Sequence, residues 1–334
     1  MMVSLRGGLK YAGITIAVLA ALLVVAYLLG FLGVPSVTGV ENRFGAVNST
    51  DTVIETDLAV HNPNPIGIRL GDTTVNYSVS MNDVAMAQGH KTGLNLGTGD
   101  STLQFRTVLD NERIPDWWYT HVTRGEVTEV LIDADLTAGF LFGQTFAFQT
   151  NETIRTDILS GFDSNETRPI DANAPLISDP VLYLNETTAR YGEEVTRSQT
   201  PIETTFTVYN PKPFPYTVSR IGYDIRMNDV VVGTGETDRG YTLRPRTPET
   251  LQATTVIDNE NLDEWWVTHV ENDQVTELTV DFYIVVQPDI AGRELPSIRI
   301  DLDAFDYTTT IETDVFGTKA TDGGDGGDGT SSGS

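Results

Sequence analysis

Two stretches of sequence decide the fold of this chain: VLDNERIPDWWYTHV at residues 108–122 and VIDNENLDEWWVTHV at residues 256–270. The second stretch begins 148 residues after the first (256 − 108). The same offset relates EVTEV at residues 126–130 to QVTEL at residues 274–278. A repeat of this length predicts two tandem domains, because a unit of more than about 100 residues can build its own hydrophobic core.

Each stretch contains apolar residues at helical spacing, at positions i, i+3, i+4, i+7 and i+8. The first set is Ile114, Trp117, Trp118, His121 and Val122, and the second set is Leu262, Trp265, Trp266, His269 and Val270. This spacing predicts one face of an amphipathic helix in each unit. Because each histidine shares its face with two tryptophans, the pattern favours a packed, hydrogen-bonded histidine over a catalytic one.

Strands with alternating side chains accompany each helix. Residues 54–61, IETDLAVH, and residues 202–209, IETTFTVY, alternate apolar and polar side chains, which is typical of half-buried β-strands. An Asn-Pro pair follows each strand and ends it, because proline cannot donate a hydrogen bond to the ladder. These residues have a structural interpretation as turn formers, and contact with a ligand is the alternative.

About seven short strands and one short helix per unit indicate a mainly β chain of two tandem two-sheet sandwiches. The predicted segments are 1–34 (cytoplasmic N-terminus and anchor), 35–160 (first sandwich), 161–174 (linker), 175–318 (second sandwich) and 319–334 (tail). The linker is polar and contains Asn, Asp and Pro. The tail contains TDGGDGGDGTSSGS, which predicts a disordered acidic segment.

Residues 11–34, YAGITIAVLAALLVVAYLLGFLGV, form a run of 24 residues without a charge. A transmembrane helix needs about 20 apolar residues, so this run predicts a retained single-pass anchor, with a cleaved signal peptide as the alternative. Arg6 and Lys10 precede the run, and the positive-inside rule therefore places the N-terminus in the cytoplasm. We expect the bulk of the chain to lie outside the cell membrane.

Five Asn-x-Ser/Thr sequons fit an extracellular placement, because such sequons accept N-linked glycans only on a secreted face. They begin at Asn48, Asn76, Asn151, Asn165 and Asn185. Threonine is abundant in this chain, so some of these matches arise by chance. Asn165 and Asn185 lie in polar stretches and are the better candidates for a glycoprotein.

The 334 residues include 21 basic and 47 acidic side chains, so the net charge is −26 (21 − 47). Such an acidic surface disfavours nucleic acid as a partner. The absence of cysteine excludes disulfides, thiolate metal sites and a catalytic cysteine. An acid-rich, lysine-poor chain is typical of halophilic archaea, where ~1 M salt shortens the Debye length to about 3 Å. An acidic protein from an organism of moderate salt is the alternative.

The strand that ends at Asn-Pro, followed by a meander with a single helix, resembles the WHy (water stress and hypersensitive response) domain of LEA type 2 proteins. The resemblance rests on Asn62, Pro63 and Asn64 in the first unit and on Asn210 and Pro211 in the second, where Lys212 departs from the motif. It implies a sandwich of the fibronectin-III or immunoglobulin type, no catalysis, and a role in desiccation or osmotic stress. For membrane-anchored members it also implies a lipid-binding groove.

The sequence contains no zinc-protease motif, nucleophile elbow or phosphate-binding loop. We therefore expect no catalytic residue, no metal site and no cofactor. The first hypothesis is a non-enzymatic, membrane-anchored protein that protects the cell in osmotic or drying stress and holds hydrated cations weakly. The second is an envelope binding module for lipid, glycan or another surface protein. The third is a hydrolase whose site is assembled from distant acidic residues.

Overall fold

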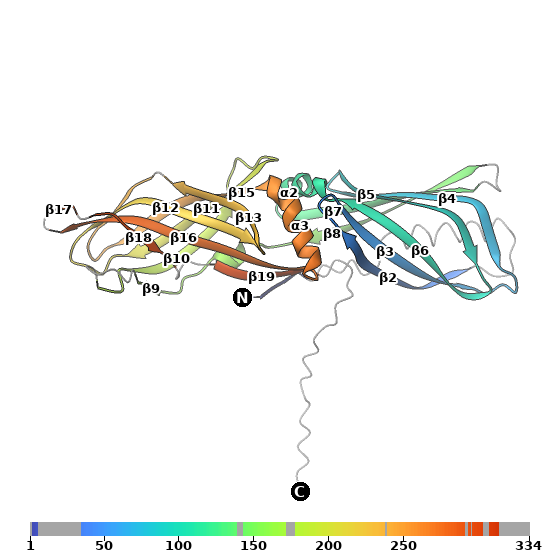
Figure 1. Cartoon of the computed structure of the whole chain (residues 1–334), viewed down its shortest axis with the longest axis horizontal. Coiled ribbons are helices and arrows are strands. Elements are labelled where there is room, and N and C mark those ends of the chain that lie inside the picture. The colour runs from blue at the N-terminus through green and yellow to red at the C-terminus, as the bar shows by residue number, and fades with distance from the viewer. Residues whose placement is uncertain are drawn as a thin grey trace, which may run out of the picture.

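The computed structural model describes residues 2–5, 35–138, 143–171, 178–237, 239–290, 293–294, 296–302 and 307–313. Two β-rich domains lie end to end, and their two α-helices meet in the middle of the molecule (Figure 1). The predicted membrane segment at 11–34 and the predicted tail from 319 lie outside the described residues. Within the part of the chain that is described, no helix is long and apolar enough to cross a membrane.

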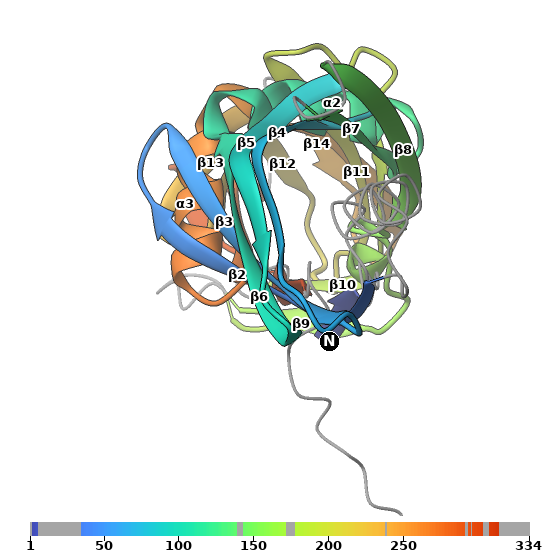
Figure 2. The same cartoon turned by 90° about the vertical axis from the view of Figure 1, so that its right-hand side faces the viewer.

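The first domain is one seven-stranded antiparallel sheet in the order β2-β3-β6-β5-β4-β7-β8. Its strands are β2 (Ser36–Val47), β3 (Asp51–Asn62), β4 (Ile68–Met81), β5 (Val84–Leu96), β6 (Gly99–Asp110), β7 (Val127–Ala138) and β8 (Gln144–Arg155). Figure 2 shows this sheet end-on, curled from β2 round to β8. The prediction of two separate sheets is therefore wrong for this domain.

Strand β5 is the reason that the first domain has a single sheet. Most of β5 pairs with β4, but Ala87, Gln88 and Gly89 also pair with β6, and this joins the two halves. Gly89 permits the close approach, because a Cβ atom placed there would lie 1.9 Å from the ring of Tyr77. The side chain of Tyr77 therefore reaches β6, where its hydroxyl donates a hydrogen bond to the carbonyl of Arg106 at 3.1 Å.

The second domain has the predicted two sheets, one in the order β15-β11-β10-β9 and one that contains β19-β16-β12-β13. Its strands are β9 (Arg168–Ile170), β10 (Leu182–Tyr191), β11 (Gln199–Tyr209), β12 (Tyr216–Met227), β13 (Val230–Thr237), β14 (Tyr241–Leu243), β15 (Pro248–Asp258), β16 (Val275–Ile290), β17 (Arg293–Glu294), β18 (Ile298–Asp301) and β19 (Tyr307–Thr313). Strand β1 (Met2–Leu5) pairs in parallel with β19. The fibronectin-III or immunoglobulin type of sandwich stays a prediction.

The predicted amphipathic helices are confirmed as α2 (Ile114–Thr123) and α3 (Leu262–Glu271). A 3₁₀ turn precedes each helix, η1 (Asn111–Arg113) and η4 (Asn259–Asn261). Asp110 and Asp258 immediately precede these turns, and the carboxylate of each accepts a hydrogen bond from the backbone two residues ahead, as expected of an N-cap. Gly125 follows α2 with a φ of +69°, a left-handed conformation that favours glycine.

The alternating strands bury the residues that the sequence pattern predicts. In β3 the side chains of Leu58 and Val60 are 0% exposed, and in β11 those of Phe206 and Val208 are 1% exposed. Burial of such a side chain contributes roughly 1.5–3 kcal/mol to the hydrophobic stabilisation of the fold. One apolar cluster extends from Trp118 of the first domain through the core of the second, so the domains share a core.

The stretch predicted as a linker, 161–174, contributes to the second domain. It overlaps η3 (Ser160–Phe162) and contains β9, which pairs with β10. The side chains of Phe162 and Ile170 are buried in the shared core. The composition of the segment did not predict the burial of these two apolar residues, because most of their neighbours are polar. Only short parts of the segment contact the core.

Candidate functional site at the domain junction

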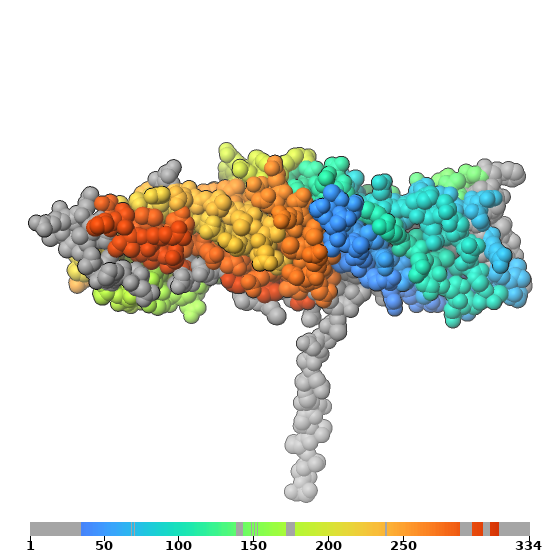
Figure 3. All heavy atoms as spheres, in the orientation of Figure 1, coloured from blue at the N-terminus to red at the C-terminus, as the bar shows by residue number. Residues whose placement is uncertain are grey.

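The second tryptophan of each helix reaches into the opposite domain. The indole nitrogen of Trp118 donates a hydrogen bond to the hydroxyl of Thr200 at 3.0 Å, and that of Trp266 donates to the hydroxyl of Thr52 at 3.1 Å. Thr52 and Thr200 are 148 residues apart, like the tryptophans, so the contact is reciprocal. The junction thus has the form of an interface between two copies of one unit. Figure 3 shows the two domains in direct contact there.

Each of these threonine hydroxyls also donates a hydrogen bond to an asparagine of its own domain. The hydroxyl of Thr52 donates to the side-chain oxygen of Asn111 at 2.8 Å, and that of Thr200 donates to Asn259 at 2.9 Å. All four side chains are buried. A buried polar group without a partner costs about 1–3 kcal/mol, so this relay lets both indoles enter the core without that penalty.

The first tryptophan of each helix bonds within its own domain. Trp117 donates to the hydroxyl of Thr128 at 2.9 Å, and Trp265 donates to that of Thr276 at the same distance. The same hydroxyls lie 2.7 Å from Nδ1 of His121 and of His269. The structure therefore places both predicted histidines in the core, hydrogen-bonded beside their tryptophans.

Hydrogen-bond donors determine the tautomer of His121. The hydroxyl of Thr156 donates its single hydrogen to a carboxylate oxygen of Glu126, so it accepts a hydrogen bond from Nε2 of His121 at 2.8 Å. A neutral imidazole then accepts at Nδ1, from the hydroxyl of Thr128. Burial lowers the pKa of His121 to about 4, which keeps the ring neutral near pH 7.

One position in this network differs between the copies. Glu126 is buried with a φ of +59°, and its carboxylate accepts hydrogen bonds from Thr156 and, at 2.8 Å, from the backbone of Ile158. Gln274 occupies the equivalent position in the second copy, with a φ of +62°. The first copy therefore uses a buried charge to hold the start of the segment that leads to the second domain.

An apolar cavity of about 190 Å³ lies in the first domain, against the junction. Strands β2 to β8 line it, β12 and β19 of the second domain also contribute, and all four tryptophans of the chain lie in its wall. An apolar cavity of about 150 Å³ in another protein is known to stay dry and to bind benzene. The cavity here is therefore large enough for a small apolar ligand.

The matching space in the second domain is only about 40 Å³. Equivalent strand positions line both cavities, for example Thr56 and Thr204, or Met81 and Met227. The side chain of Phe162 fills the second space and packs edge-on against Phe206, with ring centroids 6.1 Å apart. The two spaces therefore share several equivalent wall positions but differ in what fills them.

The Asn-Pro motifs lie at the outer ends of the domains, far along β3 and β11 from the junction (Figure 1). The buried amide of Asn62 donates to the carbonyls of Ile66 and Gly97, at 3.1 and 2.7 Å. Asn210 donates in the same way to the carbonyls of Phe214 and Leu243, at 2.9 and 3.1 Å. The motif therefore closes a loop, which favours the structural interpretation.

The predicted sequons lie in different settings. Asn48 is exposed in the turn between β2 and β3, and Asn165 is exposed in the loop before β9. Asn76, Asn151 and Asn185 lie within strands. A loop gives a glycosylating enzyme easier access than a paired strand does, so Asn48 joins Asn165 as a better candidate, and Asn185 becomes a weaker one.

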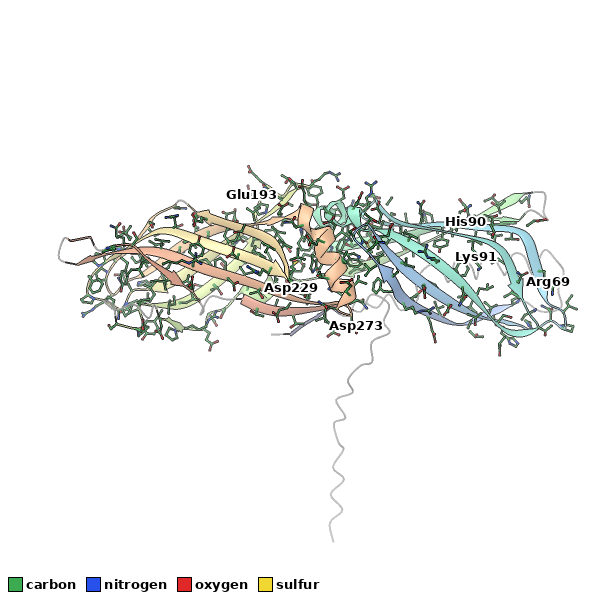
Figure 4. The ribbon with its side chains drawn as sticks, in the orientation of Figure 1. Arg69, His90, Lys91, Glu193, Asp229 and Asp273 are labelled. Carbon is green, nitrogen blue, oxygen red and sulfur yellow. The ribbon has the colours of Figure 1, made fainter. Side chains whose placement is uncertain are left out.

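Several charged side chains are exposed on the outside of both domains. Glu193, Asp229 and Asp273 are exposed near the junction, whereas Arg69 and His90 are exposed on the outer half of the first domain (Figure 4). In the described part of the chain, no group of three His, Asp or Glu side chains is arranged to hold a metal ion.

Sequence reasoning found the tryptophans and histidines but missed the threonines that bond them. A signal was available for Thr52, Thr200, Thr128 and Thr276, because each pair recurs at the same 148-residue offset as the helices. No sequence pattern predicted the cavity, because the residues that line it alternate like those of any buried strand. Its presence depends on what fills the space between the strands.

Comparison with known proteins gives a family for both copies. Residues 57–153 and 205–301 each match the family model LEA_2, described as late embryogenesis abundant protein. A search of curated proteins found no match. A crystal structure of a protein from Archaeoglobus fulgidus is 31% identical over 38% of this chain and 97% of its own length, with a TM-score of 0.30.

Proposed function

Because this chain belongs to the late embryogenesis abundant family through two LEA_2 units, we propose that it is a non-enzymatic, membrane-anchored protein of the cell envelope. Its two WHy-like domains act outside the cell, where they protect it in desiccation or osmotic stress. The reciprocal junction is the observation that supports this proposal. It commits the tryptophans and histidines of both copies to structure, and a shared core holds the two domains as one body.

The charge of the chain supports a protective role at high salt. Without Arg6 and Lys10, the part beyond the predicted anchor carries 19 basic and 47 acidic residues, a net charge of −28 (19 − 47). Exposed carboxylates hold water and hydrated cations, and concentrated salt screens their mutual repulsion. A halophilic, archaeal envelope is the setting in which this composition favours solubility.

The anchor is proposed from residues 11–34, which carry no charge and are mostly apolar. The anchored state has a structural requirement, since Met2–Leu5 pair with β19 in the described structure. A cytoplasmic N-terminus cannot pair with an extracellular domain at the same time, so β1 must leave β19 when the helix inserts. The absence of native cysteine allows a direct test of this topology.

The topology test uses single cysteines at Ser4 and Ser49, labelled on intact cells with a membrane-impermeant thiol reagent. We expect Ser49→Cys to react and Ser4→Cys to react only after the cells are opened. Reaction of both positions on intact cells would contradict the anchored topology.

The physiological test is deletion of the protein in its own organism. We expect reduced survival after a downward salt shift or after drying, with rescue by the wild-type chain and not by a chain that lacks residues 11–34. Equal survival of the deletion strain and the parent under both stresses would overturn the protective role.

The cavity in the first domain favours a second candidate function, a binding module of the envelope. Its apolar wall suits a lipid better than a glycan, since a glycan needs many hydrogen-bond partners. Native mass spectrometry of the purified full chain tests this function. We expect a lipid-sized adduct, and a chain that stays ligand-free after extraction from its own membranes would contradict it.

A further inference from the structure

A polar groove lies on the second domain, where the edges of its two sheets come together. Strand β13 is an edge of one sheet and β15 is an edge of the other. The groove has a volume of about 390 Å³, and its lining includes Glu203, Glu236, Arg239, Gln252 and Thr254. Pockets for small ligands typically measure about 300–1,000 Å³, so the groove is large enough to hold one.

Larger side chains occupy the equivalent place in the first domain. The ammonium group of Lys91 donates a hydrogen bond to the carbonyl of Gln104 at 2.7 Å and lies 5.4 Å from the ring centroid of Phe105. Thr237 of β13 is equivalent to Lys91 (237 − 91 = 146), and Ala253 of β15 is equivalent to Phe105 (253 − 105 = 148). Both replacements are smaller, and both residues line the groove. The groove therefore opens where the first copy is filled.

The backbone at the groove is held by side chains and not by a ladder. In the first domain β5 pairs with β6, but in the described structure no ladder joins the equivalent β13 to β15. The hydroxyl of Tyr223 accepts a hydrogen bond from the backbone of Val256 at 2.9 Å. The hydroxyl of Tyr241 accepts from the backbone nitrogen of Gln252 at 3.0 Å and donates to its carbonyl at 2.7 Å. The edge of β15 is thus fixed while the groove beside it stays open.

Two charged groups of the groove are also held in position. The carboxylate of Glu236 accepts hydrogen bonds from the hydroxyl of Tyr283 and, at 3.1 Å, from Arg220, and both bonds lower its pKa. Its oxygens retain lone pairs, because a carboxylate has about four acceptor sites. Arg239 donates to the side-chain oxygen of Gln252 at 3.2 Å. Side chains that are already oriented lose less conformational entropy when a ligand binds.

The third charged group, Glu203, is uncompensated. It is exposed on β11 and has no ion-pair partner among the described residues. The equivalent Glu55 of the first copy pairs with Arg43 at 2.7 Å. A strong hydrogen-bond acceptor is therefore available in the second copy and is already engaged in the first.

We propose that the groove between β13 and β15 binds a neutral sugar, either as a free saccharide or as a unit of an envelope glycan. This inference rests on the envelope-binding function proposed above and gives it a separate site and ligand class. Each sugar hydroxyl both donates and accepts. Neighbouring hydroxyls can therefore donate to Glu203 and Glu236 and accept from Arg239 and Gln252.

The lining disfavours the other classes of ligand. It contains two carboxylates and one guanidinium, so an anion such as a phosphate or a uronate would meet net repulsion. An apolar ligand would strip water from these polar groups without replacing its hydrogen bonds. An added peptide strand would have to displace the tyrosine hydroxyls from β15. A cationic amino sugar is the competing ligand, and the test includes it.

Saturation-transfer NMR on the full chain tests the proposal. The chain is purified in a detergent whose head group is not a sugar, because an alkyl glycoside would compete for the groove. The first arm offers glucose, galactose and mannose, with glucosamine and glucuronate as the cationic and anionic comparisons. The second arm offers neutral oligosaccharides of the sugar that binds. Tighter binding in the second arm would identify a glycan unit, and equal binding would identify a free saccharide.

We expect saturation transfer to at least one neutral sugar, and matched variants assign it to the groove. Glu203→Gln should weaken binding about tenfold, because a charged acceptor is lost, whereas Glu55→Gln in the first copy should not. Thr237→Lys places the side chain of the first copy in the groove and should abolish binding. Lys91→Thr in the first copy should leave it unchanged. Circular dichroism checks that each variant is folded.

Several results would overturn the proposal. Absence of transfer to every neutral sugar would do so, as would transfer to glucosamine or glucuronate alone. Wild-type affinity in folded Glu203→Gln and Thr237→Lys would show that the sugar binds elsewhere. A chain that binds no sugar but carries a lipid-sized adduct in native mass spectrometry would refute this site and leave the binding function intact. A chain that shows neither would refute both.

Discussion

The two domains of this chain are alike at the junction and unlike in their interiors. Both copies keep the same relay of tryptophan, threonine and asparagine, with distances that agree within about 0.1 Å. Their interiors differ in sheet closure, in the volume left between the strands, and in one buried charge. The junction is shared by both copies, so a change in either one disturbs the other. An interior belongs to one copy and is free to diverge.

The largest expected effect comes from breaking the junction. Trp118→Ala and Trp266→Ala should each lower the free energy of unfolding by about 3–5 kcal/mol, because each leaves a cavity in the shared core. Urea denaturation followed by circular dichroism measures this loss. Similar losses would show that the junction is energetically symmetric, as its hydrogen bonds are.

Tryptophan-to-phenylalanine variants are the control for that comparison. Trp118→Phe and Trp266→Phe keep most of the packing and lose the indole donor, so each should cost less than the alanine variant at the same position. A phenylalanine variant as unstable as its alanine counterpart would contradict the view that packing supplies most of the stabilisation.

A smaller effect should follow from acid. The folded chain holds the pKa of His121 at about 4, below the ordinary value of 6.5, so the unfolded chain binds more protons between these pH values. His121 therefore contributes stability that is present above pH 6.5 and is lost as the pH falls towards 4. A shift of roughly 2.5 units corresponds to about 3 kcal/mol.

His121→Gln isolates this contribution, because glutamine does not titrate. The free energy of unfolding of the wild type should fall more steeply than that of the variant between pH 6.5 and pH 4. If the free energy of unfolding of the two proteins changed in parallel over this range, His121 would not be the group responsible. His269→Gln is the matched variant in the second copy.

The outer loops should give an intermediate and equal effect in the two copies. Asn62→Ala and Asn210→Ala each remove an amide that serves two backbone carbonyls, so we expect a loss of about 2 kcal/mol from each. Thermal unfolding of the two variants checks this. A much larger loss at Asn62 than at Asn210 would indicate that the open first domain depends more on its loop.

The smallest effect should come from exchanging the buried charge. Glu126→Gln gives the first copy the side chain of the second, and it keeps an oxygen that can accept from Thr156 and Ile158. Charged acceptors bond more strongly, but burial of the charge opposes that gain, so we expect a change of at most about 1 kcal/mol. Urea denaturation would contradict this if the loss approached that of Trp118→Ala.

Sequence patterns predicted the parts of the fold that follow from periodicity. The 3.6-residue spacing around Trp117 and Trp265 identified both helices, and alternation identified β3 and β11. Periodicity does not say which strands pair, so the joining of β4 and β6 by β5 was missed. That pairing depends on Gly89, whose missing side chain admits Tyr77.

The candidate site was predicted only in part, for a related reason. The sequence predicted an apolar helix face around Trp118 and Trp266 without saying what it covers, and the structure shows that both side chains cross to the other unit. A face of apolar residues has the same pattern whether it covers its own sheet or a neighbouring domain. Phe162 was assigned to a polar linker because one aromatic residue among polar ones has no period.

The sequence by itself determined the duplication, the two helices, the alternating strands and the acidic charge. Each of these is a property of neighbouring residues or of a repeated order, and local sterics and burial act on them directly. Only the tertiary structure decided which tryptophan bonds which threonine, and why one of two matched cavities stays open. Those outcomes depend on side chains that are about 80 to 210 residues apart in the sequence. The positions of the strands determine which of these side chains come into contact and how much space is left between them.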